Sequence, residues 1–231
     1  TRSAICIVDS LFFNLFQIMR KIINNLYHIG DSGCSVFMVN SGSKGDLVLI
    51  DCGMNIGLIQ KIKIEGFKPR NIKHCFLTHC HIDHIGACSD LLKIAPEVKF
   101  YAHELDADPI ENKGFDSKIA ASWYGVKYQP IKLFKRIKEE IEEFSIGNYI
   151  FKSIHTPGHT PGSIAIYVKL GDKGVLFPGD VHGPFMKNFD SNLRDFQKSM
   201  QKLLDLNADI LCEGHFGVFK SAEKVRKYIK G

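Results

Sequence analysis

The chain has 231 residues, of which 45% are hydrophobic and 24% are charged, and its formal net charge is +5. This length and composition are ordinary for a water-soluble globular protein with one domain or two small ones. No apolar run is long enough to cross a bilayer, and so modest a positive charge does not by itself indicate a nucleic-acid partner.

Residues 1–21 are predicted to be an N-terminal extension that precedes a domain over residues 22–231. Apolar side chains crowd its first 18 residues, but Asp9 and Asn14 interrupt them and no small-residue cleavage site of a signal peptide follows. We expect an added strand or helix that covers the core or a subunit interface, so a homodimer is a candidate assembly. A membrane-surface segment is the alternative, and Met19 is a candidate true start of the chain.

Strands and helices are predicted to alternate along the rest of the chain. Apolar alternation and turn residues predict strands at 22–29, 34–41, 47–50, 72–77, 98–102, 131–137, 149–155, 163–169, 174–178 and 209–212. Helical spacing predicts helices at 56–65, 85–95, 192–206 and 221–230, with a partly helical region at 103–128. Because no Pro/Gly/Ser-rich linker separates the two similar halves, we predict one α/β domain in which two packed sheets are covered by helices.

The seven cysteines are odd in number and form no Cys-x-x-Cys pair. This pattern disfavours a disulfide framework and indicates buried thiols in a reducing compartment, so we expect a cytoplasmic protein. Cys80 lies between two histidines, but on an extended segment its side chain points away from theirs and is not expected to bind metal.

The run Thr-His-Cys-His-Ile-Asp-His-Ile-Gly over residues 78–86 carries four metal-ligand side chains within six positions. His79 and His81 are two residues apart, which places both rings on one face of an extended segment, as one metal needs. Asp83 and His84 follow where a strand gives way to a helix, so they can face a second metal beside the first. A single His-x-His would be weak evidence, but the full run is strong evidence for a metal site.

Three further candidate ligands follow turns in the second half of the chain. His159 lies between two Thr-Pro-Gly turns, Asp180 ends Leu-Phe-Pro-Gly-Asp, and His215 ends Leu-Cys-Glu-Gly-His. The two oxygens of an aspartate can bridge two metals, which an imidazole cannot. Asp51 ends a strand and is a candidate to brace a ligand histidine, because metal-bound histidines usually donate their other N–H. His182 is a candidate proton or hydrogen-bond donor.

With Asp51-Cys52-Gly53, these motifs stand in the order found in the metallo-β-lactamase superfamily of metallohydrolases, which the chain resembles over roughly residues 22–230. The resemblance implies a four-layer αββα sandwich of two mixed β-sheets flanked by helices, with a dinuclear site at one edge. It also implies that one metal is held by His79, His81 and His159. The other would be held by Asp83, His84 and His215, with Asp180 as the bridge.

The candidate ligands indicate which branch of the superfamily the chain resembles. The true β-lactamases lack the bridging aspartate, so antibiotic hydrolysis is not expected as the native role of a chain with Asp180. The pattern is most similar to the glyoxalase-II-like and lactonase-like branch. The expected cofactors are two divalent ions, zinc first, with iron or manganese as alternatives, since this donor set suits all three.

We therefore predict a dinuclear hydrolase of small molecules in which a metal-bridging hydroxide attacks an ester, lactone or thioester carbonyl. The predicted catalytic residues are Asp83, Asp180 as a proton shuttle, and His182. One alternative is a mononuclear iron persulfide dioxygenase of the same superfamily. Another is a phosphodiesterase or nuclease, suggested by four basic residues within 132–138; four glutamates within 139–143 offset that charge, so no nucleic-acid partner is expected.

Overall fold

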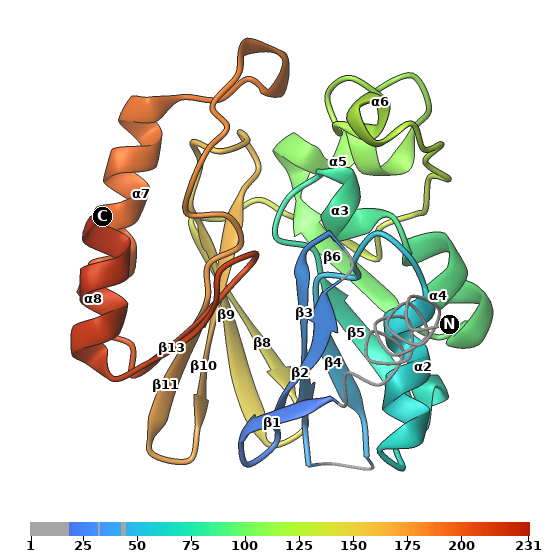
Figure 1. Cartoon of the computed structure of the whole chain (residues 1–231), viewed down its shortest axis with the longest axis vertical. Coiled ribbons are helices and arrows are strands. Elements are labelled where there is room, and N and C mark those ends of the chain that lie inside the picture. The colour runs from blue at the N-terminus through green and yellow to red at the C-terminus, as the bar shows by residue number, and fades with distance from the viewer. Residues whose placement is uncertain (1–18, 32, 43–44) are drawn as a thin grey trace, which may run out of the picture.

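The computed structural model describes residues 19–31, 33–42 and 45–231, and its strands form two sheets that pack face to face (Figure 1). The first sheet has seven strands, in the spatial order β1 (Arg20–Ile23), β2 (Leu26–Asp31), β3 (Ser35–Asn40), β4 (Leu47–Ile50), β5 (Ile72–Phe76), β6 (Lys99–His103) and β7 (Lys135–Ile137). The second sheet has six strands, in the order β13 (Gly217–Lys220), β12 (Ile210–Glu213), β11 (Lys173–Phe177), β10 (Ile164–Leu170), β9 (Tyr149–His155) and β8 (Ile141–Ile146). Both sheets mix parallel and antiparallel pairs.

Helices cover the outer faces of the two sheets (Figure 1). On the side of the first sheet lie α2 (Gly57–Ile64), α3 (Ile82–Ile85), α4 (Cys88–Ile94), α5 (Glu104–Glu111) and α6 (Ala121–Tyr124). On the side of the second sheet lie α7 (Leu193–Asp205) and α8 (Ala222–Lys230). Two short 3-10 turns, η1 (Pro69–Asn71) and η2 (Lys187–Phe189), complete the regular structure of the described residues. The predicted αββα sandwich is confirmed.

Three apolar clusters hold these layers together: one between the sheets, and one between each sheet and its helices. The position of β4 between the second sheet and the helices explains why its sequence is continuously apolar. Val48 and Ile50 face the second sheet, whereas Leu47 and Leu49 face the helices, so both faces of the strand are buried. The helix α7 begins at the side chain of Asn192, which accepts hydrogen bonds from two backbone N–H groups of its first turn.

Several predicted elements differ from the observed ones. The strand predicted over 22–29 is a hairpin, because Asn25 adopts a left-handed conformation (φ 65°) between β1 and β2. The helix predicted over 85–95 is observed as the shorter α4, which begins at Cys88, because Gly86 and Ala87 separate it from α3. The strands β8 and β13 were missed. β8 forms one edge of the second sheet and carries Glu142 and Glu143, whose polar side chains hide the strand signal.

The predicted site residues lie in the loops after β4, β5, β9, β11 and β12, which gather in the upper part of Figure 1. Both sheets therefore contribute to one region at the edge of the sandwich. The interpretation of residues 1–18 as an added strand or helix lies outside the described residues.

Candidate metal centre

Three buried histidines form the first candidate ligand group. His79 and His81 follow β5 of the first sheet, whereas His159 lies in the loop between β9 and β10 of the second. The Nδ1 atom of His81 lies 3.0 Å from Nε2 of His79 and 3.0 Å from Nε2 of His159. Burial lowers the pKa of all three imidazoles, so they are neutral near pH 7. Neutral imidazole is the form that binds a metal.

A second group joins the helix α3 to the loop after β12. The Nε2 atom of His215 lies 3.4 Å from Nε2 of His84 and 3.4 Å from Oδ2 of Asp83. Burial acts to lower the pKa of His84, but the neighbouring Cys34 and then the carboxylates of Asp180 and Asp51 outweigh burial and hold this pKa well above its usual value. The pKa of His215 is also raised, because Asp180 outweighs its burial. A cation bound here displaces protons.

Asp180 lies between the two groups. Its Oδ1 atom is 3.2 Å from Nε2 of His84, and its Oδ2 atom is 3.3 Å from Nε2 of His215 and 3.5 Å from Nε2 of His159. Burial raises the pKa of Asp180, but the nearby histidines, His84 first, outweigh burial and hold this pKa well below its usual value. Gly214 permits the approach, because a Cβ atom there would lie 2.5 Å from Oδ1 of Asp180.

The spacing of these atoms fits divalent metals. Two ligands of one tetrahedral zinc ion lie about 3.3 Å apart when their bonds are about 2.0–2.1 Å long. Neighbouring nitrogen and oxygen atoms in the two groups are separated by similar distances. Within each group, all of the possible ligand atoms lie within 4.8 Å of one another, so one ion could contact them all. The Oδ1 atom of Asp180 is also buried without a hydrogen bond from any described residue, as expected for an atom that faces a cation. All seven predicted ligands are thus brought together.

The hydrogen bond expected between Asp51 and a candidate ligand histidine is present. Oδ2 of Asp51 accepts a hydrogen bond of 2.9 Å from Nδ1 of His84, which directs Nε2 of that ring toward Asp180. Asp51 is fixed in turn by the backbone N–H and the hydroxyl of Thr78, at 2.8 and 2.9 Å. Its left-handed backbone (φ 60°) is one that aspartate tolerates better than most residues.

The family model of the Metallo-beta-lactamase superfamily matches residues 29–215. The chain belongs to this superfamily. It is therefore a metal-dependent hydrolase with the sandwich fold of that superfamily, whose members bind divalent metals.

Individual relatives agree with this assignment. The chain is 28% identical to the probable metallo-hydrolase YqgX of Bacillus subtilis, over 68% of this chain and 65% of that protein. It is 22% identical to the hydroxyacylglutathione hydrolase of Tolumonas auensis, over 76% of this chain and 58% of that protein, so it spans less than two thirds of either relative. A solved B3 metallo-beta-lactamase with an active-site glutamic acid superposes with a TM-score of 0.78 and 22% identity, covering 92% of this chain and 86% of that one. This structural likeness concerns the fold.

Asp106 supports the candidate metal centre, and the sequence analysis did not identify it. Its carboxylate is fully buried and accepts hydrogen bonds from the backbone N–H of Cys80 (2.9 Å), the hydroxyl of Thr160 (2.7 Å) and the backbone N–H of Gly162 (2.8 Å). It thereby joins the His79–His81 segment to the loop of His159. The sulfur of Cys80 lies in the apolar core, as the alternation argument predicted. An acidic residue in the first turn of a helix was the only sequence signal of Asp106.

Glu213 is a second residue that the sequence analysis missed. It is fully buried, and its Oε2 atom accepts hydrogen bonds of 2.6 Å from the backbone N–H groups of His215 and Phe216. Its Oε1 atom lies 3.5 Å from Nε2 of His182, and the same Nε2 atom is 3.7 Å from Oδ2 of Asp180. The structure thus places His182 beside the metal centre, against a buried carboxylate. The carboxylate two residues before a ligand histidine was the available signal.

Three of the four cations in the basic stretch over residues 132–138 are ion-paired. Lys135 pairs with Glu142, Lys138 with Glu104, and Arg136 with two carboxylates of α5. These contacts favour a role in holding β7 and its neighbours together over a role in binding phosphates.

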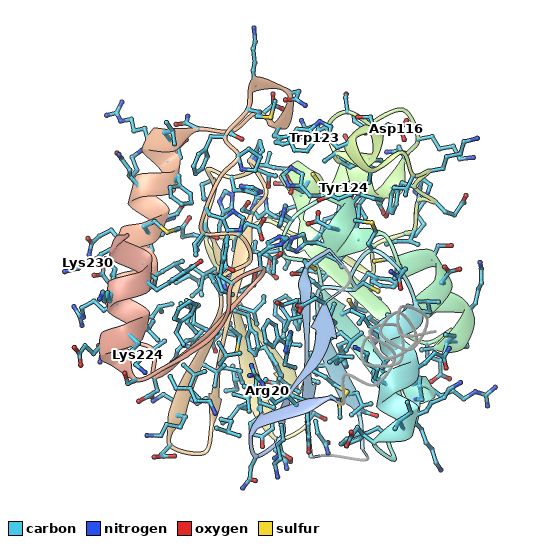
Figure 2. The ribbon with its side chains drawn as sticks, in the orientation of Figure 1. Arg20, Asp116, Trp123, Tyr124, Lys224 and Lys230 are labelled. Carbon is cyan, nitrogen blue, oxygen red and sulfur yellow. The ribbon has the colours of Figure 1, made fainter. Side chains whose placement is uncertain are left out.

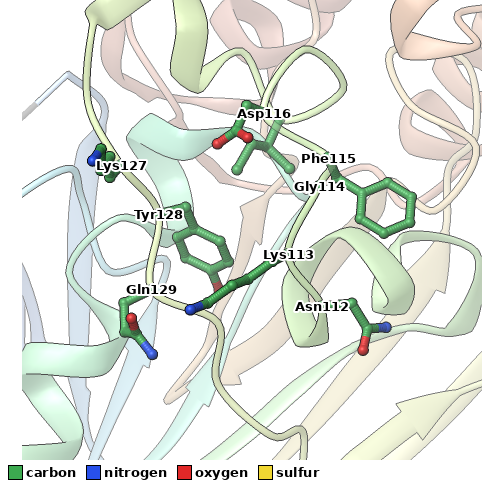
Figure 3. A pocket seen from close by; sticks show the side chains of 9 residues that line it. Asn112, Lys113, Gly114, Phe115, Asp116, Lys127, Tyr128 and Gln129 are labelled. Atoms are coloured by element: carbon green, nitrogen blue, oxygen red, sulfur yellow. The ribbon is translucent and has the colours of Figure 1, made fainter.

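A cavity of about 290 Å³ lies beneath the segment that carries α6 (Figure 3). Lys113, Asp116, Lys127 and Tyr128 are among its lining residues, and Figure 3 shows them around it. No lining residue belongs to the seven candidate ligands, so this cavity is separate from the metal centre. None of the helices in the described part of the chain combines the length and apolar character that a membrane crossing requires.

Proposed function

We propose that this protein is a dinuclear hydrolase that cleaves carboxylic esters, lactones or thioesters of small molecules. The observation that carries the proposal is the pair of three-residue ligand groups with Asp180 in contact with both. The similarity to a hydroxyacylglutathione hydrolase supports a thioester as one member of the substrate class.

The proposed ligands of the first metal are His79, His81 and His159. Those of the second metal are Asp83, His84 and His215, with Asp180 as the bridge. Zinc is the first candidate, and iron or manganese are alternatives, because imidazole and carboxylate donors suit all three. Two such ions would supply a nucleophilic hydroxide at neutral pH and would polarise the carbonyl oxygen of the substrate.

The side chains around the metals have separate proposed roles. Asp83 fixes the second ion relative to His215, 3.4 Å away. Asp180, whose oxygen atoms lie between the two ligand groups, is the proposed shuttle that would carry a proton from the attacking water to the leaving group. His182 donates a proton or a hydrogen bond to the leaving group, because its Nε2 atom lies 3.7 Å from Asp180 and its ring is partly exposed to solvent.

Elemental analysis of the purified protein, followed by assays with lactones, thioesters and phosphodiesters on the same sample, tests this proposal. We expect two metals per chain and hydrolysis of at least one carboxylic substrate. Asp180→Ala should lower the metal content and the turnover together, whereas Asp172→Ala, which removes a carboxylate that is 86% exposed, should change neither.

Other outcomes would contradict the proposal. Full activity of Asp180→Ala with both metals retained would refute the bridging role. One iron per chain with oxygen consumption would establish the persulfide dioxygenase alternative. Cleavage of phosphodiesters alone would establish the phosphodiesterase alternative.

A further inference from the structure

Exposed aromatic side chains gather around the metal centre. Among the described residues, four large aromatic side chains are exposed to solvent. Three of them, Trp123 (52% exposed), Tyr124 (47%) and Phe216 (62%), belong to segments that border the site. Large apolar side chains that are exposed in one place usually mark a binding surface, whereas scattered ones need no explanation.

On one flank, aromatic contacts lead from the surface to a candidate ligand. The ring centroid of Trp123 lies 5.0 Å from that of Phe189, and Phe189 lies 4.3 Å from the ring of His81. Figure 2 shows Trp123 and Tyr124 near α6, on the side of the loop that follows β11.

On the other flank, Phe216 directly follows the candidate ligand His215. Its ring centroid lies 4.9 Å from that of His182, the proposed donor to the leaving group. Trp123, Tyr124 and Phe216 therefore border the two candidate ligand groups from opposite sides, and the buried ring of Phe189 lies against Trp123. We call the three exposed side chains the apolar rim.

The apolar rim is held in place by polar contacts beneath it. Lys118 forms an ion pair of 2.5 Å with Asp190, and the side-chain amide of Asn188 donates a hydrogen bond of 3.2 Å to the backbone oxygen of Ser117. These contacts tie the segment before α6 to η2, and so keep Trp123 against Phe189.

We infer that the substrate carries an apolar group, an acyl chain of several carbons or an aromatic ring, that lies on the apolar rim while its carbonyl lies at the metals. This inference rests on the proposed function and names its substrate class. A substrate with a charged tail would leave these aromatic surfaces in water, whereas an apolar group would remove them from water and gain the corresponding hydrophobic free energy.

Trp123 is the only tryptophan of the chain, so its fluorescence reports directly on the apolar rim. The metal-loaded protein is titrated with straight-chain carboxylates from butanoate to decanoate, which resemble the acid product. We expect a shift in the Trp123 emission and a Kd that tightens by about two- to fourfold for each added methylene. Phe216→Ala should weaken this dependence, whereas Ile64→Ala, which removes an exposed apolar side chain at the end of α2, should leave it unchanged.

The second readout is kcat/KM for a series of esters or thioesters with increasing acyl length. It should rise with length in the wild type and in Ile64→Ala, and rise less in Trp123→Ala and Phe216→Ala. Hydrolysis without any dependence on length, together with an unchanged Trp123 emission, would overturn the inference and leave the proposed function intact. A length-dependent emission without hydrolysis of any ester would support the apolar rim and refute the proposed function. An emission that depends on protein concentration rather than on chain length would show that a second copy covers the rim, and would also overturn the inference.

Discussion

Replacing Asp106 with alanine should destabilise the protein and lower its metal content at once. The substitution leaves three buried donors without an acceptor: the backbone N–H groups of Cys80 and Gly162 and the hydroxyl of Thr160. At about 1–3 kcal/mol for each unsatisfied donor, the free energy of unfolding should fall by about 3–9 kcal/mol. That is a large share of the 5–15 kcal/mol that is typical of a folded domain. The His79–His81 segment and the His159 loop would lose their common anchor.

Asp106→Asn provides a graded comparison. Its amide can keep one oxygen toward Cys80 and Thr160, but its NH₂ group then faces the N–H of Gly162, so we expect a loss of about 1–3 kcal/mol. Asp116→Ala is the control, because it removes an exposed carboxylate from the segment that follows the same helix. Urea unfolding of the metal-loaded proteins and elemental analysis give the two readouts. If Asp106→Ala unfolds at the wild-type urea concentration with its metals retained, the anchoring role of this carboxylate is refuted.

Two further predictions concern Glu213 and His103. Glu213→Gln weakens the hydrogen bonds to the loop of His215 and the contact with His182, so kcat/KM should fall by about ten- to a hundredfold. The control Glu223→Gln, on the exposed face of α8, should have no effect. Equal steady-state rates for both variants would contradict the role of Glu213. Burial, and then the charge of His155, lowers the pKa of His103 from 6.5 to about 4. Because the folded state favours the neutral form of His103, the protein should lose stability as the pH falls from 6.5 toward 4. In His103→Gln the melting temperature should fall less steeply over this range, and parallel pH curves for wild type and variant would show that His103 does not contribute.

The candidate ligands could be predicted from the sequence because each stands next to a local signal. The four candidate ligands after β5 lie within six positions of one segment, and His159, Asp180 and His215 each follow a glycine. Such signals describe the backbone that carries a ligand, and the structure places all of these backbones at one edge of the sandwich.

Asp106 and Glu213 could not be found in the same way. Their importance comes from partners that are distant in the chain, such as Thr160 for Asp106, 54 residues away, or from burial that is set by tertiary packing. The strand β8 was missed for a related reason, since its alternating polar residues are those of a solvated edge, and its pairing with β9 is decided by the sheet rather than by its own composition. Contacts of this kind become visible only in three dimensions.

Each candidate ligand group draws side chains from both sheets: His81 and His84 come from the first, and His159 and His215 from the second. An ion bound by either group would therefore act as a cross-link between the two halves of the molecule. By mass action, free metal at a hundredfold excess over its Kd adds about 2.7 kcal/mol per site to the stability of the folded state. If metals bind as proposed, their supply in the surroundings would set how long the protein survives proteolysis as well as how fast it turns over.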